Sequence, residues 1–208
     1  MKKLLSFLIL LLPIAWVCAA VVDKPAHFEI PITEKVEGEG SGSVKFSKDA
    51  PEMEITKWSG EVAMKVKYLG VKDTGEKNVS EKVEWTQGDE TVRGYQIDDK
   101  TFEFELELVV KPAKNTFDFV IEGAENLDFF YQPALTQEEI DAGHLRPDNV
   151  VGSYAVYHKT KKDHVIGAVN FAAGKAFHIY RPKAIDANGK EEWAEMTYAN
   201  GVLSVTIP

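Results

Sequence analysis

The sequence predicts an all-β protein, an antiparallel β-sandwich or open barrel, from two kinds of pattern. Apolar and polar residues alternate over Thr101–Val109, which is typical of a strand that turns one face to a core. Several similar stretches follow or precede turn-forming residues, whereas only one short helix is indicated, near residues 137–142. Many short strands with a single helix favour two packed sheets or a barrel over a mixed α/β fold.

The first twenty residues have the organisation of a secretory signal peptide. Two lysines precede an apolar run from Leu4 to Val17, and the small residues that follow favour cleavage after Ala20. An uncleaved membrane anchor is the alternative, but the run is shorter than the roughly 20 residues that span a bilayer. We therefore expect a bacterial protein that is secreted or held at the cell surface or in the periplasm, with residues 21–208 as one sandwich-like domain.

Cleavage would leave an acidic chain without cysteine, because Cys18 and two lysines leave with residues 1–20. The formal net charge would change from −9 to −11. Nucleic acids and anionic lipids bind through basic residues, so we expect neither as a partner of the cleaved protein. Without a disulfide, packing and hydrogen bonds alone must stabilise the fold.

Further strands are predicted from the same alternation along the chain. A short strand at His27–Ile32 precedes a flexible Gly/Ser/Glu loop at residues 37–43, and residues 64–68 and 117–121 repeat the strand pattern. A strand over Phe177–Arg181 is expected to join one near Trp193. Their loop should exceed two residues, because a tight turn at Asn188-Gly189 would set Asp186 against Glu191, and like charges directly opposite are unfavourable.

The C-terminal hairpin and the helix carry the most specific local signals. Asn200-Gly201 is preferred for a two-residue type I′ turn, which would pair Tyr198 with Leu203 and Met196 with Val205 on one apolar face. Thr136 and Glu139 have the spacing of a capping box at a helix start.

The strand over Thr101–Val109 carries three glutamates on its polar face, at positions 103, 105 and 107. Carboxylates two residues apart could serve acid–base hydrolysis of a glycoside, but a solvated strand face is the favoured interpretation. Opposite charges on a neighbouring strand stabilise such a face, so Lys65 and Lys67 are hypothesised to lie beside these glutamates.

No catalytic, metal-binding or cofactor-binding motif stands out. Ser153, His158 or His178, and Asp186 include the residue types of a hydrolytic triad, but Ser153 lacks the glycine pattern of a nucleophile elbow. The histidines lack metal-ligand spacing; they are His27, His144, His158, His164 and His178. We therefore expect no metal, no cofactor and no enzymatic activity.

Aromatic residues provide the candidate ligand site. Tyr154, Tyr157 and Tyr180, with His178, fall on expected strands and could hold sugar rings by stacking. Tyrosines also commonly fill sandwich cores, and that interpretation is favoured. The alternative is a ligand site in which these tyrosines form a platform for a surface polysaccharide.

Four stretches from Thr101 onward resemble a β-rich module of large, mostly uncharacterised bacterial surface proteins and phage-related metagenomic proteins. They are Phe129–Pro133 (FFYQP), Arg146–His158 (RPDNVVGSYAVYH), Gly174–Pro182 (GKAFHIYRP) and Asp186–Lys190 (DANGK). In those proteins a segment with Tyr-Pro-Val and Asp-Pro-Thr usually follows, and this chain stops where that segment would begin. The resemblance implies a β-rich surface module and brings no catalytic residues.

Two classes of function are therefore expected. The first is an exported non-enzymatic module with a structural or adhesive role, whose partner is another extracellular protein or a surface polysaccharide. The second is a carbohydrate-binding or carbohydrate-active protein that uses exposed tyrosines. Exposure of the three tyrosines discriminates between them, because a stacking platform needs ring faces that a sugar can reach.

Overall fold

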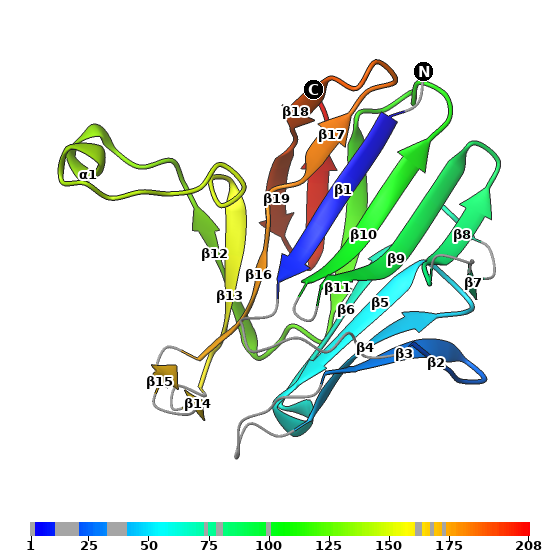
Figure 1. Cartoon of the computed structure of the whole chain (residues 1–208), viewed down its shortest axis with the longest axis horizontal. Coiled ribbons are helices and arrows are strands. Elements are labelled where there is room, and N and C mark those ends of the chain that lie inside the picture. The colour runs from blue at the N-terminus through cyan, green and yellow to red at the C-terminus, as the bar shows by residue number, and fades with distance from the viewer. Residues whose placement is uncertain are drawn as a thin grey trace.

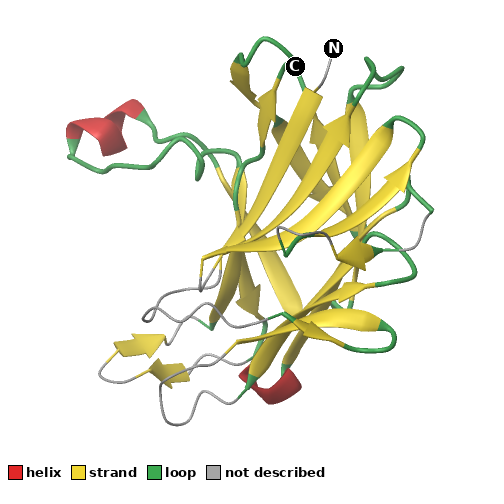
Figure 2. Ribbon diagram, turned by 45° about the vertical axis from the view of Figure 1, so that its right-hand side comes forward, coloured by secondary structure: helices red, strands yellow, loops and turns green. Residues whose placement is uncertain are grey.

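The computed structural model describes residues 3–10, 21–32, 41–72, 75–77, 81–98, 101–160, 164–166, 169–171 and 174–208. Within these ranges the chain is mostly strand, with one short α-helix and several antiparallel sheets, none closed into a barrel. The predicted all-β sandwich is therefore confirmed. Figures 1 and 2 show the two large sheets facing each other.

The first sheet has the order β12-β13-β16-β1-β10-β9-β8-β7, with β17 paired to both β1 and β18. Its strands are β1 (Lys3–Leu10), β7 (Glu76–Lys77), β8 (Val83–Gln87), β9 (Glu90–Asp98), β10 (Thr101–Leu108), β12 (Leu127–Gln132), β13 (Ser153–His158), β16 (Lys175–Ile179), β17 (Lys183–Ile185) and β18 (Glu191–Trp193).

The second sheet has the order β19-β20-β11-β6-β5-β4-β3-β2. Its strands are β2 (Val22–Asp23), β3 (His27–Ile32), β4 (Gly42–Ser47), β5 (Glu52–Lys57), β6 (Val62–Tyr68), β11 (Thr116–Glu122), β19 (Glu195–Ala199) and β20 (Val202–Thr206). A separate two-stranded sheet contains β14 (His164–Ile166) and β15 (Val169–Phe171). The helix α1 spans Gln137–Asp141, and a 3₁₀ turn covers Trp58–Gly60.

The core lies between the two large sheets and follows directly from the alternation in the sequence. Phe102, Phe104 and Leu106 of β10 are almost completely buried. The Phe104 ring lies 5.9 Å from that of Trp85 in β8, and 6.1 Å from that of Phe119 across in the second sheet. Edge-to-face contacts of this kind stabilise the packing of aromatic rings beyond the effect of the apolar area that they bury.

Both specific local predictions are confirmed. Tyr198 lies opposite Leu203 and Met196 opposite Val205, with positive φ at Asn200 and Gly201 as a type I′ turn requires. Thr136 caps α1 as expected: its side chain accepts a hydrogen bond from the Glu139 backbone, and the Glu139 carboxylate accepts one from the Thr136 backbone.

The strands between residues 175 and 193 differ in part from the prediction. The strand expected over Phe177–Arg181 ends at Ile179, and the hairpin instead joins β17 to β18. A proline at position 182 cannot donate a ladder hydrogen bond, which explains the break. The loop is longer than two residues, as predicted, since Ile185 is the residue opposite Glu191.

The predicted loop at residues 37–43 is only partly described. Residues 37–40 lie outside the described residues, whereas Gly42 and Ser43 belong to β4 and pair with β3. The loop prediction is therefore wrong at its C-terminal end. The predicted strand at His27–Ile32 is confirmed. Its backbone pairing with β4 includes Gly42 and Ser43, which their composition had assigned to the loop.

The N-terminal segment occupies an unexpected place. Residues 3–10 form β1, which lies between β10 on one side and β16 and β17 on the other (Figure 1). The expected cleavage site after Ala20 lies outside the described residues. Among the described residues, no helix has both the length and the apolarity needed to cross a bilayer.

Candidate functional site

A group of charged side chains centred on Arg93 lies on the outer face of the first sheet. Its guanidinium contacts three carboxylates: Nε lies 2.5 Å from Glu84, Nη1 lies 2.6 Å from Glu105, and Nη2 lies 2.6 Å from Glu107. We call this group the Arg93 cluster; it consists of Lys82, Glu84, Arg93, Tyr95, Glu103, Glu105 and Glu107.

Strand register explains why these residues meet. Glu105 lies opposite Arg93, and Glu103 lies opposite Tyr95, in the antiparallel pair of β10 and β9. On the other side of β9, Arg93 lies opposite Glu84 of β8. Residues directly opposite each other share one face, so three strands contribute to a single polar surface.

This surface is not the solvated strand face that the sequence predicts. Glu103 and Glu105 are only 6% and 7% exposed. The Tyr95 hydroxyl donates to Glu105 at 2.8 Å, and the Lys82 ammonium lies 3.5 Å from the centre of the Tyr95 ring. The solvated interpretation is therefore wrong, because neighbouring charged and aromatic side chains cover the glutamates.

The predicted pairing of the glutamates with Lys65 and Lys67 is also wrong. Both lysines belong to β6 of the second sheet, where their ammonium groups lie 3.4 Å and 3.9 Å from Glu52. Glu105 and Glu107 pair instead with Arg93, and Glu105 also pairs with Lys82; neither of these cations was expected from the sequence. The available signal was the stretch directly before the glutamates, where Arg93 and Tyr95 are two residues apart.

The contacts within the cluster are ion pairs and charge-assisted hydrogen bonds. Glu84, Glu105 and Glu107 all accept charge-assisted hydrogen bonds from one guanidinium. Glu103 differs, since burial raises its pKa despite a hydrogen bond from Tyr95 and the nearby Lys82. Burial, followed by hydrogen bonding to Glu105, also raises the pKa of Tyr95.

Ser153 and His178 come together, as residues of a hydrolytic triad would. Ser153 Oγ lies 2.6 Å from His178 Nε2, and it also bonds the backbone oxygen of Val150. Both residues are buried, with Ser153 at 0% exposure. Burial, reinforced by the charge of Lys175, lowers the pKa of His178 to about 4, so its imidazole is neutral at physiological pH.

The other expected triad members are elsewhere. His158 accepts a hydrogen bond from the backbone of Thr160, and the Asp186 carboxylate accepts bonds from the backbones of Asn188 and Lys190 in the β17–β18 loop. Backbone hydrogen bonds lower the pKa of Asp186, as expected for a loop-stabilising carboxylate. The Ser153–His178 pair is therefore a buried hydrogen bond joining β13 to β16.

The three candidate tyrosines do not form one flat surface. Tyr154 is 7% exposed and faces the core, where its hydroxyl accepts a hydrogen bond from the Tyr198 backbone at 2.9 Å. Tyr180 is half-buried, with its ring 4.6 Å from the buried His178. Tyr157 is half-buried and meets the exposed Phe130 edge-on, at 5.3 Å and 87°. Tyr154 therefore offers no ring face to a sugar.

The histidines are likewise dispersed. His27 lies beside Glu29 in β3, His144 lies in the exposed segment after α1, and the side chain of His164 lies outside the described residues. Within the described part of the chain, no three His, Cys, Asp or Glu side chains gather as metal ligands would.

A projecting segment, residues 133–149 between β12 and β13, stands away from the sandwich and is here called the arm (Figures 1 and 2). Hydrogen bonds brace its base: Arg146 donates to the Pro133 carbonyl, and Gly152 donates to Gln132 at 2.7 Å. The arm nevertheless exposes Ile140 and Leu145, the latter at 95%.

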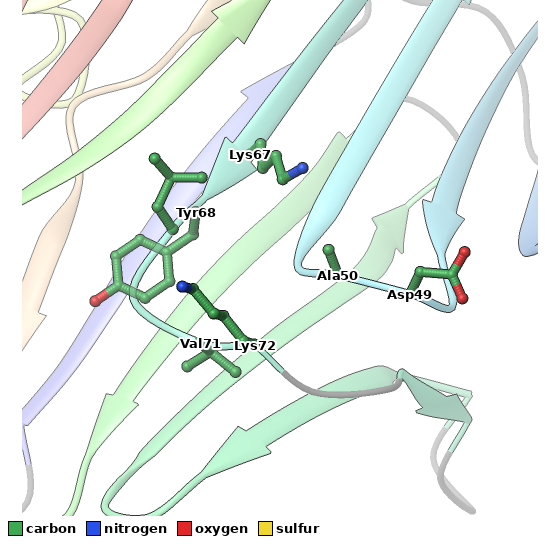
Figure 3. A pocket seen from close by; sticks show the side chains of 7 residues that line it. Asp49, Ala50, Lys67, Tyr68, Val71 and Lys72 are labelled. Carbon is green, nitrogen blue, oxygen red and sulfur yellow. The ribbon is translucent and has the colours of Figure 1, made fainter.

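A hollow of about 480 Å³ lies at one end of the second sheet, lined by residues of the β4–β5 loop and the end of β6 (Figure 3). The Tyr68 ring and the Lys72 side chain lie on one side of it, and Asp49 lies on the other. Tyr68 donates a hydrogen bond to Glu90 at 3.1 Å, which orients its ring. The hollow is open to solvent, and both charged and apolar side chains line it.

Comparisons of the chain with protein-family models, curated proteins and solved structures find no match. The resemblance of residues 101–190 to a bacterial surface module consequently remains a prediction.

Proposed function

We propose that the protein is an exported, non-enzymatic β-sandwich module with an adhesive role at or outside the cell surface. The observation that carries this proposal is the arm. Nine large hydrophobic residues are exposed in the described part of the chain, and four of them lie on β12 and the arm. These four are Phe130, Tyr131, Ile140 and Leu145.

The position and bracing of the arm support a binding role. Single exposed apolar residues are ordinary, but a concentration of them on a projection suggests contact with a partner. The capping box and the Arg146 hydrogen bond fix the conformation of the arm, so binding would lose less conformational entropy than it would with a loose loop. We therefore expect another extracellular protein to contact the arm.

The chemistry of the described residues supports a non-enzymatic role. Ser153 is buried and its oxygen is occupied by two hydrogen bonds, while the carboxylates around Arg93 bind a cation rather than flank a cleft. A leader of the expected composition at residues 1–20 supports export.

The test compares cell-surface retention of the purified exported protein with that of two variants. Ile140→Ser with Leu145→Ser should abolish retention, because the apolar contacts of the arm are lost. The control is Leu69→Ser, which changes an exposed leucine that belongs to neither β12 nor the arm. This variant should bind to cells as well as the unchanged protein does. Equal retention of all three proteins would refute adhesion through the arm.

Carbohydrate binding is the second candidate, favoured by the contact between Phe130 and Tyr157 on the outer face. It predicts salt-resistant retention on one insoluble polysaccharide or on peptidoglycan. Tyr157→Ala should then remove retention, while the Ile140→Ser and Leu145→Ser changes should not. The opposite pattern would favour a protein partner.

A further inference from the structure

The place of β1 in the first sheet is at odds with removal of residues 1–20. Residues 3–10 pair with β10 along eight positions, from Lys3 opposite Leu108 to Leu10 opposite Thr101. On its other edge β1 pairs with β16, where Ile9 lies opposite Ile179, and with β17, where Leu5 lies opposite Ala184. The same residues form the apolar run expected to be cleaved during export.

β1 is the strand that joins the two parts of the first sheet. In the described strand order, β12, β13 and β16 lie on one side, β10, β9, β8 and β7 lie on the other, and β17 reaches the sheet through β1. Loss of residues 3–10 therefore leaves two parallel edges facing each other, each with unpaired backbone groups. Unpaired strand edges readily accept another extended chain.

We propose that removal of residues 1–20 opens a slot one strand wide between β10 and the β16–β17 edge, and that the slot receives an extended segment of a partner protein in which apolar residues alternate with polar and basic ones. This inference rests on the proposed export with cleavage of the leader. It deepens the proposed adhesive role, because it names the kind of partner segment.

The inner face of the slot sets the apolar half of the pattern. Positions 5, 7 and 9 of the strand lie opposite Leu106, Phe104 and Phe102, which belong to the core face of β10. An occupant residue at each of these positions would complete the apolar layer. Burial of an aliphatic or aromatic side chain favours binding, so three such residues would together give the segment substantial affinity.

The outer face sets the polar half of the pattern. Positions 4 and 8 lie opposite Glu107 and Glu103, at the edge of the Arg93 cluster. A basic side chain directly across from a glutamate of the neighbouring strand forms a favourable cross-strand pair. Position 6 lies between Glu105 and Lys183 and therefore suits a neutral polar residue. Basic residues are consequently expected at positions 4 and 8.

The probe for this slot is a peptide of residues 3–10 that carries Leu4→Lys and Leu8→Lys. It keeps the apolar residues at positions 5, 7 and 9 and the serine at position 6. Two control peptides differ from it in one property each. The first carries Leu4→Glu and Leu8→Glu, which reverses the charge, and the second adds Phe7→Pro, which removes a ladder hydrogen bond.

The experiment uses protein exported after expression of residues 1–208, with its N-terminus determined by mass spectrometry. Calorimetry should give saturable one-to-one binding of the probe. Charge reversal should weaken binding at least tenfold at low salt, with a smaller difference at high salt, and Phe7→Pro should also weaken it at least tenfold. Hydrogen exchange should slow at amides of β10 and β16 when the probe is bound.

A protein variant tests the charge argument without disrupting the fold. Glu103→Gln should reduce the ratio of the affinities of the basic and acidic peptides at least threefold. Glu52→Gln, in the second sheet, should leave this ratio unchanged. If the exported protein is unfolded by itself, the probe should restore its β-sheet circular dichroism signal, and a failure to do so would overturn the proposal.

The remaining outcomes separate the two proposals. An exported protein that begins near residue 21 but binds no probe would overturn the slot while leaving the adhesive role intact. A protein that keeps residues 1–20 would overturn both cleavage and an open slot. Concentration-dependent oligomers that the probe dissociates would show that a second copy, not another protein, fills the slot, and would overturn the partner assignment.

Discussion

Replacement of Arg93 by methionine tests the Arg93 cluster directly. The change keeps a long side chain but removes the cation shared by Glu84, Glu105 and Glu107. The most important loss is at Glu105, whose side chain is only 8% exposed and cannot regain its interactions from water. Breaking a buried ion pair by removal of one partner costs about 3–5 kcal/mol.

The other two carboxylates add less, since both are partly solvated. Pairs of that kind contribute about 0.2–1 kcal/mol each. We therefore expect Arg93→Met to lower the free energy of unfolding by about 4 kcal/mol, a large share of the 5–15 kcal/mol typical of a folded protein. For a chain of this size, the melting temperature should fall by roughly 8–16 °C.

Urea denaturation of the purified protein at pH 7 gives the measurement. A matched control is Lys65→Met, which breaks the partly solvated ion pairs with Glu52 and Glu54 and should cost under about 2 kcal/mol. Adding Glu105→Gln and Glu107→Gln to Arg93→Met should restore part of the lost free energy of unfolding, because the two neutral amides do not repel each other as two carboxylates do. An Arg93→Met effect no larger than that of Lys65→Met would refute the reasoning.

Three further predictions concern single side chains. Glu103→Gln should stabilise the protein at pH 7. Burial raises the pKa of Glu103, so the stability that the protonated carboxyl provides at low pH is lost as the pH rises, whereas glutamine stays neutral. Denaturation at pH 7 and at pH 3 should therefore show the gain in stability only at pH 7. Burial lowers the pKa of His178 from 6.5 to about 4, so between these pH values the unfolded chain binds a proton that the folded chain does not, and the free energy of unfolding should fall by about 3 kcal/mol as the pH drops from 7 to 4. His178→Gln should flatten this pH dependence of stability, and an unchanged slope would contradict the assignment. Thr136→Ala should cost about 1 kcal/mol in the arm alone, seen as faster amide exchange at Glu139 with an unchanged global denaturation midpoint.

Features set by neighbouring residues were predictable from the sequence. The turn at Asn200-Gly201 and the cap at Thr136 depend on backbone preferences within a few positions, so their chemistry is visible in the chain itself. The alternation over Thr101–Val109 similarly identified the core face of β10.

Features that depend on which strands pair were not predictable. Alternation shows that Glu103 and Glu105 share a face but does not show what lies beside that face. The partner strand β9 supplied Arg93 and Tyr95, whereas the expected lysines belong to the opposite sheet. In the same way, the apolar composition of residues 3–10 indicates a leader and gives no sign of a position beside β10.

The pairing of β11 with β20 has a consequence for the speed of folding. Thr116 and Thr206, opposite each other in this pair, are separated by 90 positions along the chain, and their hydroxyl groups lie 2.9 Å apart. Chains whose contacts join such distant segments fold slowly, because a long loop must close before the contact forms. Newly made protein would therefore stay unfolded longer than a helical bundle of the same length does, which gives partly folded chains more time to expose the edges of unpaired strands.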